Sequence, residues 1–441
     1  MAKRSSGDAN IVKEGEFREG GPSAVFTLVV VTLLYLINYM DRMVLSATLP
    51  LIKEDLVLTD AQCGWLGTIY FIVVAVLTIP VGILCDRWSR KKTISLMALV
   101  WSLATFLSGM GARFSQVFAA RGGVGVGEAG FAPGGIAYVS GSFPEKDRGK
   151  VLGVFNLGAP LGTIVGLVVA GIMAKADIFG LGWRAPFYFF AIPGILLGIL
   201  VLVTKDYPNP PVDESSMRFS ETARLILKML KTPTLILTYF GVAAMSFVGA
   251  ALGHWLPTYF VRTRGIEVDK ATILMGGIIA VSIFGPILGG TIADRWRKRR
   301  PNARPTTAAL IALLLGIMLY VSFFIDTAGI FDAAYIVFMV VGVLMFAYTA
   351  PAYSVSQDLV PREVRSISMG VLVFITYGTL AGYAPVLVGF LSDLFGTPEE
   401  PNLTMAFMFV PAVAFIAALL FYLASVFHDR DMERFSGQGG D

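Results

Sequence analysis

The chain has 441 residues, of which 55% are hydrophobic and only 15% charged, and its formal net charge is +4. Soluble globular proteins carry about 25% charged residues, so this composition excludes an ordinary soluble enzyme. The nearly balanced charge also excludes a surface built to bind nucleic acid. The length suits about a dozen membrane spans of roughly 20 residues with short loops.

Twelve apolar runs of membrane-spanning length follow a polar N-terminal segment of 23 residues. An uninterrupted apolar segment satisfies its backbone in lipid only as a helix, so each run predicts a transmembrane helix. The first run is too long for a signal peptide, which predicts that it is retained. The runs are 24–50, 62–84, 93–111, 114–140, 151–174, 184–204, 234–260, 271–293, 305–325, 332–356, 366–390 and 403–427.

The basic residues are distributed unevenly between the two sides of these runs. With a cytoplasmic N-terminus, 26 of the 35 bases fall in the tails and cytoplasmic loops and seven fall in the opposite loops. Positive charge favours the cytoplasmic side of a membrane. The sequence therefore predicts a multi-pass membrane protein with both termini in the cytoplasm, in a bacterial inner membrane.

The longest break between runs separates the first six from the last six. It contains Tyr207-Pro-Asn-Pro-Pro211, followed by basic and apolar residues over 218–231 that predict an amphipathic helix on the membrane surface. The expected organisation has five parts: an N-terminal tail (1–23), a six-helix bundle (24–204), a linker (205–233), a second six-helix bundle (234–427) and a C-terminal tail (428–441).

The two halves repeat each other in sequence. Gly82-Ile-Leu-Cys-Asp-Arg-Trp-Ser-Arg-Lys-Lys92 matches Gly290-Thr-Ile-Ala-Asp-Arg-Trp-Arg-Lys-Arg-Arg300, and Pro144–Arg148 matches Pro361–Arg365. Both pairs fall at equivalent loops, as in transporters built from two parallel repeats. The predicted fold class is an all-α membrane protein with twelve transmembrane helices in two pseudo-symmetric six-helix bundles.

Four charged residues lie well inside the apolar runs: Asp41, Arg42, Arg121 and Glu128. A charge at mid-membrane costs about 3 kcal/mol even on the lenient insertion scale, so these groups need partners or a wet cavity. Arg121 and Glu128 share one stripe of a helix, about 10 Å apart in height, and we expect Asp41 to reach Arg121.

This cluster suggests a proton-coupled anion site. Glu128 is the firmer candidate for the proton site and Asp41 the second, because protonating either acid would release an arginine. Arg42 or Arg121 could then hold an anionic headgroup, in two hydrogen bonds if it is a carboxylate or phosphate. The competing interpretation is a structural ion-pair lattice between the two helices.

Weaker signals complete the candidate site. Asn38 shares the polar face of the first helix, and further polar or aromatic residues could line a pocket or only pack between helices: Asn156, His254, Trp255, Tyr348, Tyr353 and Tyr377. Charged residues of the repeated loops are candidate gate residues, with topology-setting charge as the alternative: Asp86, Arg87, Arg90, Arg148, Asp294, Arg295 and Arg365. No metal-ligand or nucleophile pattern and no phosphate-binding loop occur, so we expect no metal, cofactor or ATP.

The repeated loop and the run Arg121-Gly-Gly-Val-Gly-Val-Gly-Glu128 resemble signatures of the major facilitator superfamily, over about residues 25–428. Asn38-Tyr-Met-Asp-Arg42, Gly127-Glu-Ala129, Gly158-Ala-Pro-Leu-Gly162 and Leu387-Val-Gly-Phe-Leu-Ser-Asp393 resemble the Spinster family. That resemblance implies transport of lysophospholipids and sphingolipid-like amphiphiles. The Asp-Arg pair, the Arg…Gly-Glu-Ala run and Phe143-Pro-x-x-x-Arg148 are equally similar to the anion:cation symporters, which implies proton-coupled transport of sugar acids and other organic anions.

The expected function is therefore proton-coupled secondary transport by alternating access, not enzymatic catalysis. A Spinster-like amphiphile is the first expected solute and a small organic acid the alternative. A membrane sensor with a transporter fold is the third interpretation. The expected partners are the solute, protons and the lipid bilayer, and we expect a monomer.

Overall fold

The computed structural model describes residues 20–206, 219–360, 364–397 and 400–436, and within these ranges all the regular elements are helices, without strands. The helices of the first half are α1 (Gly21–Leu56), α2 (Asp60–Arg87), α3 (Arg90–Met110), α4 (Phe114–Glu128), α5 (Phe131–Ser142), α6 (Glu145–Asn156), α7 (Gly158–Lys175) and α8 (Ala185–Val201). The connecting helix is α9 (Phe219–Leu230). The second half contains α10 (Pro233–Arg264), α11 (Val268–Ser282), α12 (Gly285–Arg297), α13 (Ala303–Thr327), α14 (Phe331–Ala347), α15 (Thr349–Asp358), α16 (Arg365–Ile375), α17 (Ala384–Leu394), α18 (Leu403–Phe407) and α19 (Val410–Ser436).

These helices form the twelve expected spans, several of which are broken into two segments. The pairs α4–α5, α6–α7, α11–α12, α14–α15, α16–α17 and α18–α19 each make one span. Eleven spans within the described residues are long and apolar enough to cross a membrane. The remaining span is α4–α5, which carries Arg121 and Glu128 and is interrupted at Ala129–Gly130.

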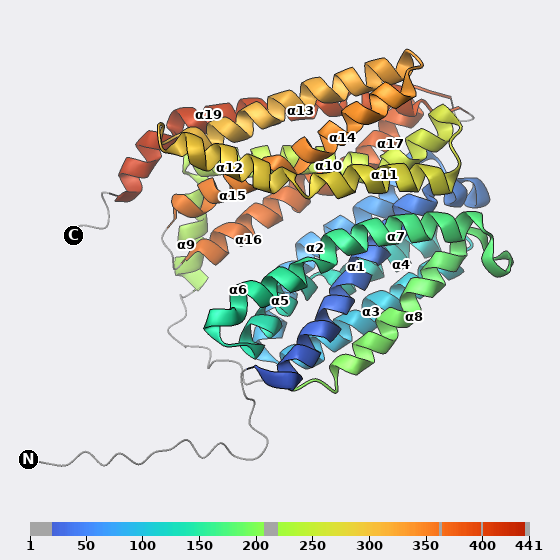
Figure 1. Cartoon of the computed structure of the whole chain (residues 1–441), viewed down its shortest axis with the longest axis horizontal. Coiled ribbons are helices and arrows are strands. Elements are labelled where there is room, and N and C mark those ends of the chain that lie inside the picture. The colour runs from blue at the N-terminus through green and yellow to red at the C-terminus, as the bar shows by residue number, and fades with distance from the viewer. Residues whose placement is uncertain (1–19, 207–218, 361–363, 398–399, 437–441) are drawn as a thin grey trace, which may run out of the picture.

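The spans gather into two bundles, α1–α8 and α10–α19, which Figure 1 shows in blue to green and in yellow to red. The bundles meet where α2 packs on α17, α7 packs on α11 and α1 packs on α10. We call the end of the molecule where α1 begins and α19 ends the terminal end, and the other end the opposite end. Large apolar side chains such as Ile287, Phe324 and Ile336 are exposed on the outer faces, as expected of a surface covered by lipid.

The sequence repeat is also a structural repeat. Arg148 donates its Nε–H to the carbonyl of Ser140 at 3.0 Å, and Arg365 donates its Nε–H to the carbonyl of Gln357 at 3.1 Å. In each case the acceptor lies eight residues before the arginine. The two arginines thus hold equivalent turns of the chain, one in each bundle.

Glycines form the seam between α1 and α7. A Cβ on Gly166 would lie 2.4 Å from the Cα of Met40, and one on Gly162 would lie 2.3 Å from the carbonyl oxygen of Leu36. The four-residue spacing of small residues therefore brings two membrane helices into backbone contact.

Replacing Gly166 with alanine is expected to destabilise the protein by about 1–3 kcal/mol, because the added methyl group overpacks this seam. The loss should be visible as a lower thermal unfolding midpoint in detergent. The matched control is Gly153→Ala, since a Cβ there meets nothing within 4 Å. Equal midpoints for the two variants would contradict the close α1–α7 contact.

The predicted amphipathic helix of the linker is present as α9. Part of its apolar face is used inside the protein: Met229 is buried, and Leu225 packs against the core cluster of the second bundle. Leu227 and Leu230 remain exposed. The helix therefore packs on α10 and α16 while leaving apolar side chains for the expected membrane surface.

Candidate functional site

The charged residues predicted inside the membrane come together in the first bundle. Arg42 on α1 donates its Nε–H to the Oε2 atom of Glu128 at 2.6 Å, and the Tyr70 hydroxyl donates to the same oxygen at 2.7 Å. The Glu128 side chain is fully buried, whereas 23% of the Arg42 side chain is exposed. The carboxylate thus holds an arginine that can still be reached from outside the bundle.

The pairing differs from the one predicted. The ion pair is Arg42–Glu128, and in the described residues no hydrogen bond or ion pair joins Asp41 to Arg121. Asp41 and Arg121 are electrostatic neighbours, but both carboxylate oxygens of Asp41 lack a hydrogen-bond partner among the described residues. Neighbouring positions on a helix point about 100° apart, and it is Arg42 whose side chain bonds to Glu128.

Tyrosines surround this ion pair. The Arg42 guanidinium lies 4.4 Å from the ring centre of Tyr39 and 5.5 Å from that of Tyr70, and the Arg121 guanidinium lies 5.7 Å from the Tyr70 ring. These are cation–π distances. The sequence analysis missed Tyr39 and Tyr70, although the cluster Asn38-Tyr-Met-Asp-Arg42 places Tyr39 beside the candidate residues.

Two predicted tyrosines of the second bundle face the same region. Tyr377 stacks on Phe71 of α2 with ring centres 5.5 Å apart, and it is an electrostatic neighbour of Tyr39 and Arg42. Tyr353 is a neighbour of Tyr377 and Tyr39. Both bundles therefore contribute aromatic side chains beside the Arg42–Glu128 pair.

The other predicted pocket residues occupy different settings. Trp255 is fully buried and donates its indole N–H to the carbonyl of Pro385 at 2.8 Å, and His254 Nε2 contacts the carbonyl of Cys63 at 3.2 Å. Tyr348 is buried with its hydroxyl 3.1 Å from that of Ser246. Asn38 is buried near Asp41, whereas Asn156 is exposed at the end of α6. In this conformation Trp255 and Tyr348 therefore pack between helices.

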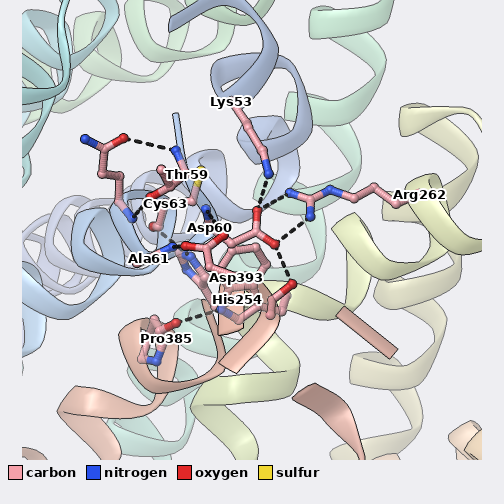
Figure 2. A network of polar contacts seen from close by, with 12 residues as sticks. Lys53, Thr59, Asp60, Ala61, Cys63, His254, Arg262, Pro385 and Asp393 are labelled. Carbon is pink, nitrogen blue, oxygen red and sulfur yellow. Dashed lines mark hydrogen bonds and ion pairs between the residues drawn. The ribbon is translucent and has the colours of Figure 1, made fainter. Parts of the chain in front are cut away.

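A second charged network, whose role the sequence analysis did not predict, joins the two bundles at the opposite end. Asp60 begins α2 and is fully buried. Its carboxylate accepts two hydrogen bonds of 2.7 Å from Arg262 of α10, one of 2.5 Å from Lys53 of α1 and one of 2.7 Å from Ser392 of α17. Figure 2 shows Lys53 and Arg262 approaching Asp60 from two sides.

Asp393 completes this network by capping α2 from the other bundle. Its carboxylate accepts the backbone N–H of Asp60 at 3.0 Å and that of Ala61 at 2.8 Å, which places a negative charge at a helix N-terminus (Figure 2). We call Lys53, Asp60, Arg262, Ser392 and Asp393 the inter-bundle lock.

Further contacts reinforce the lock along the same seam. Ser46 donates to the carbonyl of Gly253 at 2.6 Å, and the Val386 N–H donates to Thr68 at 3.2 Å. An exposed ion pair joins Lys175 to Glu267 at 2.8 Å. These bonds all lie in the half of the molecule toward the opposite end, so the bundles are fastened together there.

The predicted gate residues lie at the terminal end. Arg304 pairs with Asp358 and with Asp294, and Arg297 lies 3.5 Å from Asp358. Each of these contacts stays within the second bundle, as the backbone bonds of Arg148 and Arg365 stay within their own bundles. Arg295 is exposed, and Arg90 begins α3. The side chains of Asp86 and Arg87 lie outside the described residues.

The site is built on an ion pair and not on a cluster of metal-binding side chains. Among the described residues no group of three histidine, cysteine, aspartate or glutamate side chains could hold a metal ion. What the site offers is a buried carboxylate with an accessible arginine and aromatic walls.

Two six-helix bundles of membrane-spanning length, with charged residues buried inside one of them, define a multi-pass membrane transporter. The family model of the Major Facilitator Superfamily matches residues 31–382. The chain belongs to the Major Facilitator Superfamily.

Relatives of known name cover nearly the whole chain. An MFS-type efflux pump of Mycolicibacterium smegmatis is 27% identical, with 93% of this chain and 95% of the pump aligned. Spinster homolog 1 of Xenopus tropicalis is 28% identical over 92% of this chain and 82% of its own. A probable galactarate/D-glucarate transporter of Bacillus subtilis is 27% identical over 91% of each chain.

A solved structure supports the fold. A bacterial homologue of the human lysosomal transporter Spinster, in an inward-facing and unoccupied conformation, superposes with a TM-score of 0.76 at 23% identity, covering 95% of this chain and 98% of that one. The resemblance to both the Spinster and the sugar-acid transporters is thus confirmed.

Proposed function

We propose that the protein is a proton-coupled transporter of an anionic solute, with Glu128 as the proton site and Arg42 as the ligand of the solute's anionic group. The observation that carries the proposal is the 2.6 Å pair between a fully buried carboxylate and a partly exposed arginine. Protonation of Glu128 would remove the counter-charge of Arg42. The arginine would then be free to hold a carboxylate or phosphate of the solute.

The ends of the molecule fit the inward-facing stage of alternating access. The distribution of basic residues favours a cytoplasmic position for the terminal end. The bundles are fastened by the lock at the opposite end, which would face outward. Opening the lock while closing the terminal end would expose the Arg42–Glu128 pair to the other side of the membrane.

The solute class we propose first is a Spinster-type amphiphile with an anionic headgroup. Spinster homolog 1 is among the relatives of this chain, and aromatic side chains from both bundles flank Arg42. A sugar acid or other small carboxylate is the second candidate, because a probable galactarate/D-glucarate transporter is similarly related and Arg42 would bind a carboxylate equally well.

The location we propose is the inner membrane of a bacterium, with the chain acting as a monomer. Two of the aligned relatives are bacterial. The charged residues Asp294, Arg304 and Asp358 would lie in the cytoplasmic headgroup region, where their contacts could rearrange as the terminal end closes.

Measuring solute-triggered proton movement in proteoliposomes tests the proposal and separates its two solute classes. The panel contains lysophospholipids, sugar acids and small carboxylates, with empty liposomes as the control. We expect a proton signal with lysophospholipids. A signal with sugar acids alone would assign the protein to the second class, and folded protein silent to the whole panel would overturn proton-coupled anion transport and favour a sensor.

A further inference from the structure

The second copy of the repeated loop carries a cluster of exposed bases that the proposed transport at Arg42 does not use. Five of the six residues after Asp294, at the terminal end of α12, are basic and exposed: Arg295, Arg297, Lys298, Arg299 and Arg300. Four of the five are arginines. A guanidinium binds a phosphate through two parallel hydrogen bonds, whereas a lysine acts as a point charge, so this composition favours a phosphate partner.

The first copy of the loop uses its bases inside the protein, and the second copy does not. Lys91 donates to the carbonyl of Thr204 at 3.1 Å, and the Lys92 ammonium lies 5.9 Å from the ring centre of Trp88. In the part of the chain that the structure describes, four bases of the second copy make no side-chain hydrogen bond or ion pair: Arg295, Lys298, Arg299 and Arg300.

The carboxylates beside this cluster already have partners. Asp358 is shared by Arg304 and Arg297, and Asp294 pairs with Arg304 at 3.1 Å. These acids balance the arginines that they contact and leave the remaining bases of the loop without a counter-charge. The loop is therefore suited to attract an anion from outside the protein.

An exposed apolar stripe of α12 leads into the cluster. Leu288 and Ile292 are both exposed, and they precede Arg295 by seven and three residues, which places all three on one face of the helix. Ile287 beside them is exposed as well. An acyl chain lying on this stripe would bring the phosphate of the same molecule to the bases.

We propose that the bases of residues 295–300 and the apolar stripe of α12 form a binding site for an anionic phospholipid of the cytoplasmic leaflet. The guanidinium groups hold the phosphate, and the acyl chains lie along α12. A base just outside a membrane span strengthens the attraction of an anionic lipid surface about fivefold. The inference goes beyond the proposed function, because a bound phospholipid of this kind requires no transported solute.

Native mass spectrometry of the full chain in detergent tests the site, with equal amounts of dioleoyl phosphatidylglycerol and dioleoyl phosphatidylcholine. We expect the wild-type protein to bind the anionic lipid about tenfold more tightly than the zwitterionic one. The triple variant Lys298→Gln/Arg299→Gln/Arg300→Gln should lose at least about tenfold in affinity for phosphatidylglycerol, because it removes three of the unpaired charges. Its affinity for phosphatidylcholine should stay at the wild-type value.

The matched control removes the same charge elsewhere at the terminal end. Lys146→Gln/Lys150→Gln/Lys231→Gln replaces three exposed lysines that lie outside the cluster, and it should keep the wild-type affinity for phosphatidylglycerol. Equal losses in the two triple variants would mean general attraction by positive charge and would overturn the site. A wild-type protein without preference for phosphatidylglycerol would overturn it too.

Two further measurements separate this site from other anion sites. Glycerol phosphate carries the phosphate without acyl chains, so it should not displace the lipid; displacement would assign the bases to a soluble phosphate ester and overturn the lipid site. Arg42→Gln should keep the preference for phosphatidylglycerol, because Arg42 lies on α1 in the first bundle. Loss of the preference in Arg42→Gln would place the lipid at the proposed solute site instead, whereas failure of the proposed transport would leave the expected lipid binding unchanged.

Discussion

Replacing Glu128 with glutamine is expected to abolish uphill transport while leaving exchange of solute across the membrane. In a carrier that moves one proton with each solute, a gradient of one pH unit is worth about 1.4 kcal/mol, which supports about tenfold accumulation. The amide cannot take up the proton, so accumulation should fall to the level of simple equilibration. Solute uptake into proteoliposomes at imposed pH gradients measures the effect directly.

The structural reason for this expectation is that Glu128 has one charged hydrogen-bond partner, Arg42, and one neutral partner, Tyr70. Arg42 and the Tyr70 hydroxyl both donate to Oε2, and a glutamine oxygen could still accept from either. The variant therefore loses the negative charge while keeping an acceptor of similar size. Arg42, no longer neutralised, would remain available to an anion at every pH.

Two further variants distinguish loss of proton coupling from misfolding. Glu128→Asp keeps the titratable charge and should retain proton-driven accumulation at a reduced rate. Tyr70→Phe removes one donor but no charge, and it should also remain coupled. Accumulation by Glu128→Gln that still follows the pH gradient would remove Glu128 as the proton site, whatever solute is carried.

The twelve spans and the charged cluster could be predicted from the sequence because both depend on strong, local signals. An apolar run of membrane length permits only a helix when the whole protein lies in a bilayer, and Arg121 stands out because almost every other base lies outside the runs. The helix breaks at Ala129–Gly130 and near Leu157 also fall at glycine-rich segments.

The pairing within the cluster could not be predicted from the sequence, because it depends on how α1 is rotated about its axis. Asp41 and Arg42 are adjacent in sequence, and a rotation of about 100° exchanges which of them faces Glu128. The predicted Asp41–Arg121 contact was therefore wrong in its partner, although the four residues do come together. Backbone packing at Gly162 and Gly166, which sets the rotation of α1 against α7, decides the outcome.

The inter-bundle lock escaped the sequence analysis for a different reason. Lys53, Asp60 and Arg262 each lie at a helix end beside a loop, where charged residues are ordinary and predict nothing alone. Arg262 lies about 200 positions after Asp60 in the chain. Only the packing of α2 against α10 and α17 shows that Asp60 is buried and shared between the bundles.

Removing the Asp60 carboxylate is expected to open the opposite end of the transporter. In the closed arrangement Asp60→Asn would leave Arg262 and Lys53 partly buried without their counter-charge, and breaking a buried ion pair in this way costs about 3–5 kcal/mol. When the opposite end opens, water can solvate Arg262 and Lys53, so the mutation destabilises the closed state more than the open state. A difference of about 3 kcal/mol shifts the ratio of closed to open molecules by more than a hundredfold.

Spin labels at Val57 and Ile330 would measure this shift. Val57 lies in the turn between α1 and α2 and Ile330 in the turn between α13 and α14, and their side chains are 88% and 58% exposed. They therefore report the separation of the bundles at the opposite end. In Asp60→Asn we expect the distance distribution to move to longer values than in the wild-type protein.

The chain supplies a matched control at the same end. Lys175 and Glu267 also join the two bundles, but their ion pair is exposed, and such pairs contribute only about 0–1 kcal/mol. Glu267→Gln should thus leave the distance distribution close to that of the wild type. If Asp60→Asn also left the distance distribution unchanged, the lock would be a by-product of helix packing. The close contact between α2 and α17 would then hold this end closed, since a Cβ on Gly64 would lie 2.3 Å from the carbonyl oxygen of Pro385.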